Sequence, residues 1–231
     1  MKSKVKSHTK NGLICLLAAH VLLLPLLVSI YLFITYFFQI RIEEMLSSAG
    51  TEKFWNYFLI FALSTFIFSL AIFILFVIGV IYLIVGRKEF GKRHEKFVKY
   101  GLVFLMLSII LNFSTGFLVD SVKTGIDTVS SFFGVLVSLC FLYNLENKVG
   151  KIVLYSVLII NICFSFLPIL FSPSSLIKIL FSSLIIIPVT IFILVFILSL
   201  IVYLIPIIRI NKGELIVETP SLPESFSEQK Q

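Results

Sequence analysis

The chain alternates between long apolar stretches and short polar gaps. Six apolar stretches can be drawn, and almost every Asp, Glu, Lys and Arg lies in a gap between them. The stretches cover residues 13–38, 54–85, 97–119, 126–143, 152–171 and 176–208. A helix rises about 1.5 Å per residue, so roughly 20 apolar residues cross the hydrocarbon core of a bilayer. The pattern therefore predicts an all-α fold, a polytopic transmembrane bundle of six helices.

Residues 54–85 and 176–208 are longer than a single crossing needs, so those helices must tilt, kink or project past the headgroups. Pro188 and Pro206 each remove a backbone donor from the last stretch, which predicts a kink there. An alternative is that residues 176–187 enter the membrane as a re-entrant segment covered by protein.

Composition and length set the domain organisation. The chain has 231 residues, of which 59% are hydrophobic and 13% charged, whereas soluble domains have about 25% charged residues. We expect a basic N-terminal tail at residues 1–12, a transmembrane domain at 13–210 and a flexible acidic tail at 211–231. The run 13–38 is too long for the apolar core of a signal peptide, so it is expected to stay as the first span.

The lysines and arginines are unevenly divided between the two sides of the predicted membrane. Of the 19 Lys and Arg residues, 15 would lie on one side of the membrane, in the two tails and in the second and fourth connections. Basic residues collect on the cytoplasmic side, so both termini are predicted to be cytoplasmic, which an even number of spans also requires. The chain is therefore predicted to be a multi-pass protein of the cytoplasmic membrane that contacts membrane lipid. Nucleic acid is excluded as a partner, because no soluble module carries the charge.

Small and polar residues form stripes on the third and fourth stretches. They recur every four residues, which places each set along one helix face. The third stretch carries Ser108, Asn112 and Gly116, and the fourth carries Ser130, Gly134 and Ser138. A connection at residues 120–126 would make the two helices antiparallel neighbours, with small residues that allow close backbone approach. Helix packing is the main interpretation, and the alternative is that Asn112 lines a polar path or pocket.

Asn161 and Ser165 form a second polar pair, on the fifth stretch. Interhelical hydrogen bonding is again the main interpretation. Should a pocket exist, Asn112 and Asn161 are the first candidates to line it.

The second connection, Gly86–Gly101, is the densest polar element. On a helix, Phe90, His94, Phe97 and Gly101 would fall near one edge, with basic residues covering the rest. Gly86 and Gly91 make a helix break plausible at its start. The element either only fixes topology or lies on the cytoplasmic surface and contacts anionic lipid or a partner. The side chains for such contact would be Arg87, Lys88, Lys92, Arg93 and Lys96.

Catalytic and cofactor motifs are missing from the sequence. It has no HExxH, GxSxG or Walker-type motif, no paired aspartates within a stretch and no Cys/His cluster with metal spacing. His20 is the lone histidine within a stretch, whereas a transmembrane haem ordinarily needs two axial ligands. The three cysteines lie in apolar stretches, as small buried residues do. We therefore expect no enzymatic activity, no cofactor and no metal.

The same segment, Gly86–Gly101, resembles a family of uncharacterised multi-spanning membrane proteins of thermoacidophilic archaea. The matching residues are Gly86, Phe90, Gly91, His94, Val98 and Gly101. The composition, rich in Ile, Phe, Ser and Lys and poor in Arg, is similar too. The resemblance implies an archaeal multi-pass membrane protein and implies no particular activity.

The sequence as a whole favours a non-enzymatic component of a membrane or membrane complex. Such a protein would act by association with lipid, with other membrane proteins or with itself. The alternative is a small transporter or channel for a neutral or apolar solute.

Overall fold

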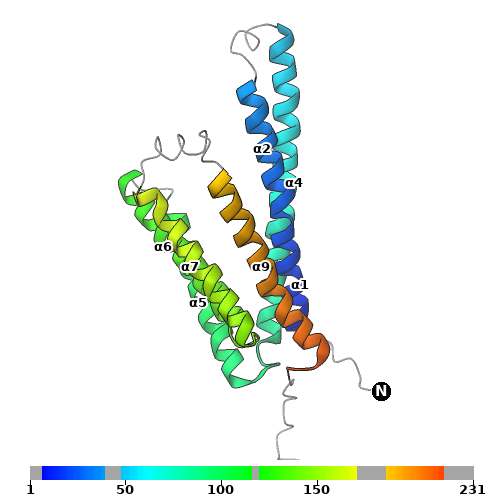
Figure 1. Ribbon diagram of the computed structural model, residues 1–231, viewed down its shortest axis with the longest axis vertical. Coiled ribbons are helices and arrows are strands. Elements are labelled where there is room, and N and C mark those ends of the chain that lie inside the picture. The colour runs from blue at the N-terminus through cyan, green and yellow to red at the C-terminus, as the bar shows by residue number, and fades with distance from the viewer. Residues whose placement is uncertain (1–6, 40–47, 116–119, 171–185, 216–231) are drawn as a thin grey trace, which may run out of the picture. The chain divides into compact units, whose positions relative to one another are not determined.

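The computed structural model describes residues 7–39, 48–115, 120–170 and 186–215, and these ranges consist of helices joined by short turns, without strands. The predicted all-α fold is confirmed for them. The helices are α1 (His8–Val21), α2 (Leu23–Gln39), α4 (Ser48–Gly86), α5 (Gly91–Thr115), α6 (Asp120–Leu142), α7 (Lys148–Leu170) and α9 (Ile186–Lys212) (Figure 1).

Among the described residues, five helical segments are long and apolar enough to cross a membrane. They are His8–Phe33, Phe54–Gly86, Gly91–Thr115, Lys123–Leu142 and Ile193–Lys212. The helix α7, with 23 residues, occupies the fifth predicted stretch, although its side chains are described only as far as Cys163. The chain thus has the helices of a multi-pass membrane protein.

The first apolar stretch is divided into α1 and α2. The division falls at Leu22, whose N–H still donates to the carbonyl of Ala18 at 3.0 Å. Pro25 has no N–H, and its ring crowds the carbonyl of Val21, so the regular hydrogen-bond pattern is interrupted just before the proline. The expected single helix over residues 13–38 is therefore two helical pieces in succession.

The predicted connection between the third and fourth stretches is wrong. Residues 120–126 form the first two turns of α6, which begins at Asp120, while α5 ends at Thr115. An aspartate at the first position of a helix is favourable because it faces the positive end of the helix dipole. Gly116 lies outside the described residues.

The last predicted stretch is described only from residue 186 onward. Pro188 lies in the first turn of α9, where a proline costs no hydrogen bond, and Pro206 lies inside the helix. The re-entrant segment considered for residues 176–187 lies almost wholly outside the described residues, as do residues 216–231 of the acidic tail.

The chain divides into two compact units. The first, here the helical-pair unit, spans Asn11–Tyr82 and consists of α1 and α2 running alongside α4 (Figure 1). The second, here the four-helix unit, contains α5, α6, α7 and α9 together with residues 7–10 and 83–90.

In the helical-pair unit, the buried side chains among residues 11–33 and 54–82 lie at one end of the pair. Leu13, Leu16 and Ala19 of α1 are buried there with Val80 of α4. A Cβ at Gly79 would lie 2.9 Å from Leu16 Cδ2, so the glycine lets the two helices approach closely. Farther along, α2 and α4 contact each other through a Phe33–Phe61 ring stack at 4.1 Å and a Ser29–Ser64 hydrogen bond at 2.8 Å.

In the four-helix unit, α5 packs on α6, α6 on α7, and α7 on α9. Val98, Phe141 and Leu154 are buried between these helices. A Cβ at Gly101 would lie 2.5 Å from Phe141 Cε1 and 3.1 Å from Cys140 Cβ, so only glycine fits without movement. The beginning of α5 lies beside the end of α6, where Phe97 stacks on Tyr143 at 5.3 Å.

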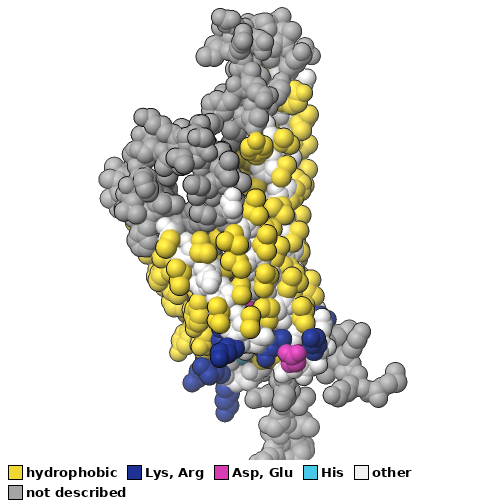
Figure 2. Space-filling model, viewed as in Figure 1, with side chains coloured by type: hydrophobic (Ala, Val, Ile, Leu, Met, Phe, Trp, Pro, Cys, Tyr) yellow, Lys and Arg dark blue, Asp and Glu magenta, His cyan; other side chains and the backbone are white. Residues whose placement is uncertain are grey.

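Basic side chains gather at one end of the apolar surface. Figure 2 shows Lys and Arg below a face that is almost entirely hydrophobic where it is coloured. In the four-helix unit this end holds the start of α5, the start of α7 and the end of α9. The distribution is that of a membrane protein whose charged residues collect at one boundary of the bilayer.

Candidate functional site

Two serines join α5 to α6 at the centre of the predicted stripes. Ser108 Oγ and Ser130 Oγ lie 3.0 Å apart, Ser130 Oγ is 3.0 Å from the Ser108 carbonyl, and Ser108 Oγ is 3.1 Å from the Ser130 carbonyl. Ser130 is 1% exposed. The structure therefore brings these two predicted residues together as an interhelical hydrogen-bonded pair.

The other described residues of the two stripes do not contact each other between α5 and α6 in this way. Gly134 is exposed, and no described atom lies within 4 Å of the position that its Cβ would take, so the close approach predicted at this glycine is absent from the described structure. Ser138 hydrogen-bonds Tyr203 and so connects α6 to α9. Asn112 is exposed on α5. The close approach between α5 and α6 is at Gly101, near the start of the third predicted stretch.

Asn161 is half-buried on α7. Its Nδ2 donates to the carbonyl of Val157, one turn earlier in the same helix, at 2.9 Å. The Ser165 side chain lies outside the described residues. The predicted polar pair is therefore described only at its first member, whose amide is engaged with its own helix backbone.

The basic connection is a tight turn followed by the first turns of α5. The helix α4 ends at Gly86, and Gly91, with φ of 86°, begins α5, so the break predicted at these glycines is confirmed. A positive φ is costly for any residue with a Cβ, which explains glycine at position 91. The expected separate surface element is instead continuous with the third span.

The five predicted basic residues fall into two groups. Arg87 is half-buried, with Nη1 3.2 Å from the Ile84 carbonyl and Nε 3.7 Å from Glu95 Oε1. The other four are exposed: Lys88, Lys92, Arg93 and Lys96. On α5 the basic positions lie opposite the buried face formed by Gly91, His94, Val98 and Gly101. The exposed cations therefore project outward, where headgroups or a partner can reach them.

Five of the six positions on which the expected resemblance rests are buried in this turn or on this face. Gly86, Gly91, His94, Val98 and Gly101 are all buried. The His94 ring is fully buried and lies edge-on to Phe90 at 5.6 Å, and neither of its nitrogens has a hydrogen-bond partner among the described residues. The matched positions are thus those that fix the turn and its packing.

Glu89 holds the start of α1 against this turn. Its Oε1 accepts the His8 N–H at 2.7 Å, and its Oε2 accepts the Thr9 N–H at 3.1 Å and the Ser7 hydroxyl at 2.7 Å. Ser7 Oγ in turn accepts the Lys10 N–H at 3.1 Å, as an N-cap residue does. A carboxylate from a distant turn thus satisfies the free amides at the positive end of α1.

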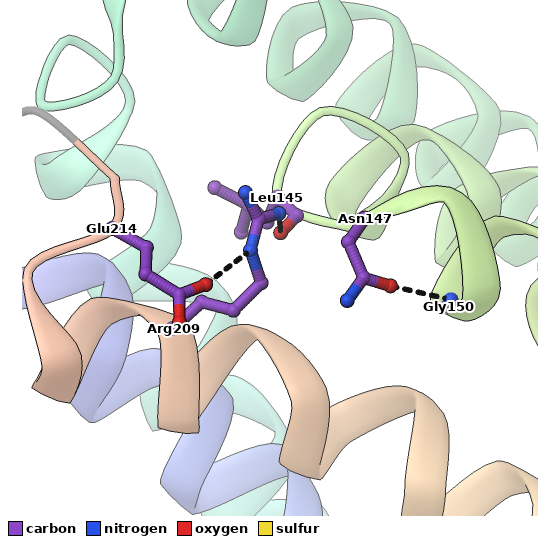
Figure 3. Close-up of polar contacts among 5 residues, drawn as sticks. All are labelled: Leu145, Asn147, Gly150, Arg209 and Glu214. Carbon is purple, nitrogen blue, oxygen red and sulfur yellow. Dashed lines mark hydrogen bonds and ion pairs between the residues drawn. The ribbon is translucent and has the colours of Figure 1, made fainter.

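A second polar cluster lies where α6, α7 and α9 meet. Arg209 of α9 donates from Nη1 to the Leu145 carbonyl and from Nε to Glu214 Oε2, the latter at 3.2 Å (Figure 3). Asn147 caps α7, because its Oδ1 accepts the Gly150 N–H at 2.7 Å (Figure 3). Between Leu145 and Asn147 lies Glu146, which is 4% exposed.

The Glu146 carboxyl group is buried without a hydrogen-bond partner. Neither Oε1 nor Oε2 has one among the described residues. Burial raises the pKa of this carboxyl to about 8, although the positive charges of Arg209 and Lys151 act in the opposite direction. Gly150 makes room for it, because a Cβ at that position would collide with Glu146 Oε2. Near neutral pH the group therefore holds a proton.

The roles of Glu89 and Glu146 are not predicted by the sequence analysis. Glu89 is one of two acidic residues in a basic connection, and its partners lie about 80 positions away. Glu146 stands beside an apolar stretch and directly before the N-cap Asn147, which is the one local pattern that could have drawn attention to it.

Within the described part of the chain, no group of three His, Cys, Asp or Glu side chains could hold a metal ion. The cysteines at positions 15, 140 and 163 are free. Comparisons with protein-family models, curated proteins and solved structures found no match to this chain.

Proposed function

We propose that the protein is a non-enzymatic component of the cytoplasmic membrane, with six spans and both termini in the cytoplasm, that acts by associating with lipid and other membrane proteins. The sixth span in this proposal is α7, which has the length of a span and connects the basic end of the four-helix unit to the opposite side. The archaeal origin implied by Gly86–Gly101 is part of the same proposal.

The observation that carries the association role is how polar groups within the spans are bonded. Ser108 and Ser130 bond each other, and Asn161 bonds its own backbone. Hydroxyl groups elsewhere in the spans donate to carbonyls three or four residues earlier: Ser114, Thr115, Thr128, Ser131, Ser156 and Ser199. Groups bonded in this way have their hydrogen-bonding capacity taken up by a neighbouring helix or by their own backbone and offer little to a passing solute.

The exposed cations at the start of α5 supply the second part of the proposal. Lys88, Lys92, Arg93 and Lys96 project away from the buried face and attract an anionic lipid surface with about 1 kcal/mol for each residue near the headgroups. Binding to vesicles with anionic lipid should weaken when all four are changed to Gln. Unchanged binding would contradict a lipid-contact role.

Transport of a neutral or apolar solute is the second candidate, and Asn112 favours it. This amide is exposed on α5 among the exposed apolar side chains of Ile109 and Phe113. An amide placed in hydrocarbon without a partner is costly, so it must meet water, another helix or a substrate.

Thiol labelling from water separates the two candidates. In a background without the native cysteines, Asn112→Cys and Asn161→Cys are treated with a membrane-impermeant thiol reagent. The association role predicts that neither position reacts, because each faces lipid or a helix. Reaction at both positions, protected by a solute, would contradict it and support transport.

A further inference from the structure

We propose that Glu146 is a proton-operated switch: when its carboxyl group loses its proton to water, Arg209 turns from Glu214 to the Glu146 carboxylate, and the segment after α9 is released. The switch does not depend on which lipid or protein the molecule meets, so it goes beyond the proposed function.

The first requirement is a carboxyl group whose charge state matters to its surroundings. Glu146 is 96% buried, and neither of its oxygens has a hydrogen-bond partner among the described residues. A buried carboxylate that lacks partners is costly, whereas the neutral acid is tolerated. The pKa of about 8 places the change of charge close to neutral pH.

The second requirement is a nearby cation that can pair with the ionised Glu146 carboxylate. The charged groups that act on Glu146 are Arg209 of α9 and Lys151 of α7. Arg209 already bonds the carbonyl of Leu145, the residue before Glu146 (Figure 3). Its guanidinium group therefore already lies at the cluster, where the Glu146 carboxylate can become its partner.

The third requirement is that Arg209 has a weaker partner, Glu214, which it can leave. Its Nε lies 3.2 Å from Glu214 Oε2, and the side chain of Glu214 is 47% exposed. A charge pair in water is weak, and one away from water is several times stronger. An ionised Glu146 therefore competes successfully with the exposed Glu214 for the same guanidinium.

The segment that Glu214 holds is fixed to α9 by a C-terminal cap. Gly213, with φ of 69°, donates to Ile210 at 3.1 Å, and the Glu214 N–H donates to the Arg209 carbonyl at 3.0 Å. This is the Schellman arrangement, which leaves Glu214 beside Arg209. Loss of the ion pair removes the side-chain anchor of the segment and leaves only the backbone cap.

The experiment follows the segment and the carboxyl group together. In a cysteine-free chain in lipid vesicles, a spin label at Leu215→Cys reports mobility, and infrared spectra report the protonated carboxyl band. Between pH 6 and 9.5 the band should disappear with a midpoint near 8, and the label should become mobile with the same midpoint.

Three variants test the coupling. Glu146→Gln imitates the protonated acid, so the label should stay immobile at every pH. Glu214→Gln removes the exposed partner, so the label should be mobile throughout. Gly150→Ala pushes the Glu146 carboxyl outward, so the midpoint should fall toward the ordinary carboxyl value. This variant also tests the switch if Glu146→Gln does not fold.

The matched control is Glu95→Gln, which removes a carboxyl group that pairs with Lys99 on α5 and should leave the titration unchanged. A label whose mobility does not change with pH would overturn the switch. A titration of the label in Glu146→Gln like that of the unmodified chain would overturn it as well.

Discussion

The helical-pair unit has the more apolar spans, yet the almost completely buried leucines near the end of α6 belong to the four-helix unit. On α4, Ile60 and Phe66 are 66% and 65% exposed, whereas Leu142 and Leu145 near the end of α6 are 1% and 0% exposed. Lipid tails are as apolar as leucine, so hydrophobicity alone gives no reason for two spans to pack. The places where they do pack are marked by small or hydrogen-bonding residues.

The same comparison shows where polar groups are used. In the helical-pair unit, α2 and α4 share one interhelical serine pair among the described residues, Ser29 and Ser64. The four-helix unit has a similar pair in Ser108 and Ser130, and it also buries the carboxyl group of Glu146. The four predictions below test this difference, beginning with the largest expected effect.

The buried carboxyl group should make stability depend on pH. Glu146 has a pKa of about 8 when folded and an ordinary value of 4.5 when exposed. Its stabilising contribution is complete below pH 4.5 and is lost as pH rises toward 8, because the folded protein alone keeps the proton. The free energy of unfolding should fall by up to about 1.4 kcal/mol for each pH unit in that window.

Equilibrium unfolding in mild detergent at several pH values measures this dependence. Glu146→Gln should flatten the curve between pH 5 and 8. A slope of the same size in the Gln variant would assign the dependence to other groups and remove the contrast between the units.

Disrupting the close helix packing at Gly101 should cause the next largest loss of stability. Gly101→Leu places a side chain against Phe141, which is 3% exposed, so overpacking should cost about 1–3 kcal/mol. Gly134→Leu is the matched control on the partner helix, because its surroundings are open. Thermal unfolding in detergent compares the two variants, and equal losses would show that packing at Gly101 is not special.

Removing the contacts of Glu89 should lower the free energy of unfolding a little less than Gly101→Leu does. Glu89→Ala leaves the His8 and Thr9 amides and the Ser7 hydroxyl without their acceptor, which should cost about 1–2 kcal/mol. Hydrogen exchange at those amides should accelerate roughly tenfold, since about 1.4 kcal/mol corresponds to a factor of ten. Exchange rates that stay the same would show that the start of α1 is held by other contacts.

The serine pairs should give the smallest effect. A double-mutant cycle on Ser108→Ala and Ser130→Ala should give a coupling of about 0.6 kcal/mol, the average for interhelical hydrogen bonds in membranes. The same cycle on Ser29 and Ser64 should give less, because Ser64 Oγ also donates to the Phe61 carbonyl of its own helix at 2.9 Å. A larger coupling in the helical-pair unit would reverse the comparison.

The sequence was sufficient to predict the helices, because spans of about 20 apolar residues are a strong local pattern. It was also sufficient for the turn at Gly86 and Gly91 and for placing Ser108 and Ser130 on stripes of neighbouring helices, although not for the connection between those helices. Helix ends were less predictable: the charged turns of α5 and the residues from Asp120 are helical although they are polar.

The carboxylate clusters were beyond prediction from one sequence. Glu89 bonds residues 80 to 82 positions away, and Arg209 bonds a carbonyl 64 positions away. Which glycine permits close approach also depends on the partner helix, so the stripe pattern predicts Gly134 although Gly101 is the close contact. Such contacts are decided by packing between distant segments and leave no periodic pattern in the chain.

The topology of the six proposed spans is tested most directly by reporters fused to the two ends of the full-length chain. A fluorescent protein that matures only in the cytoplasm and a phosphatase that is active only outside are fused in turn to each terminus. The account predicts fluorescence without phosphatase activity at both ends. Phosphatase activity at one end and fluorescence at the other would require an odd number of spans and would contradict it.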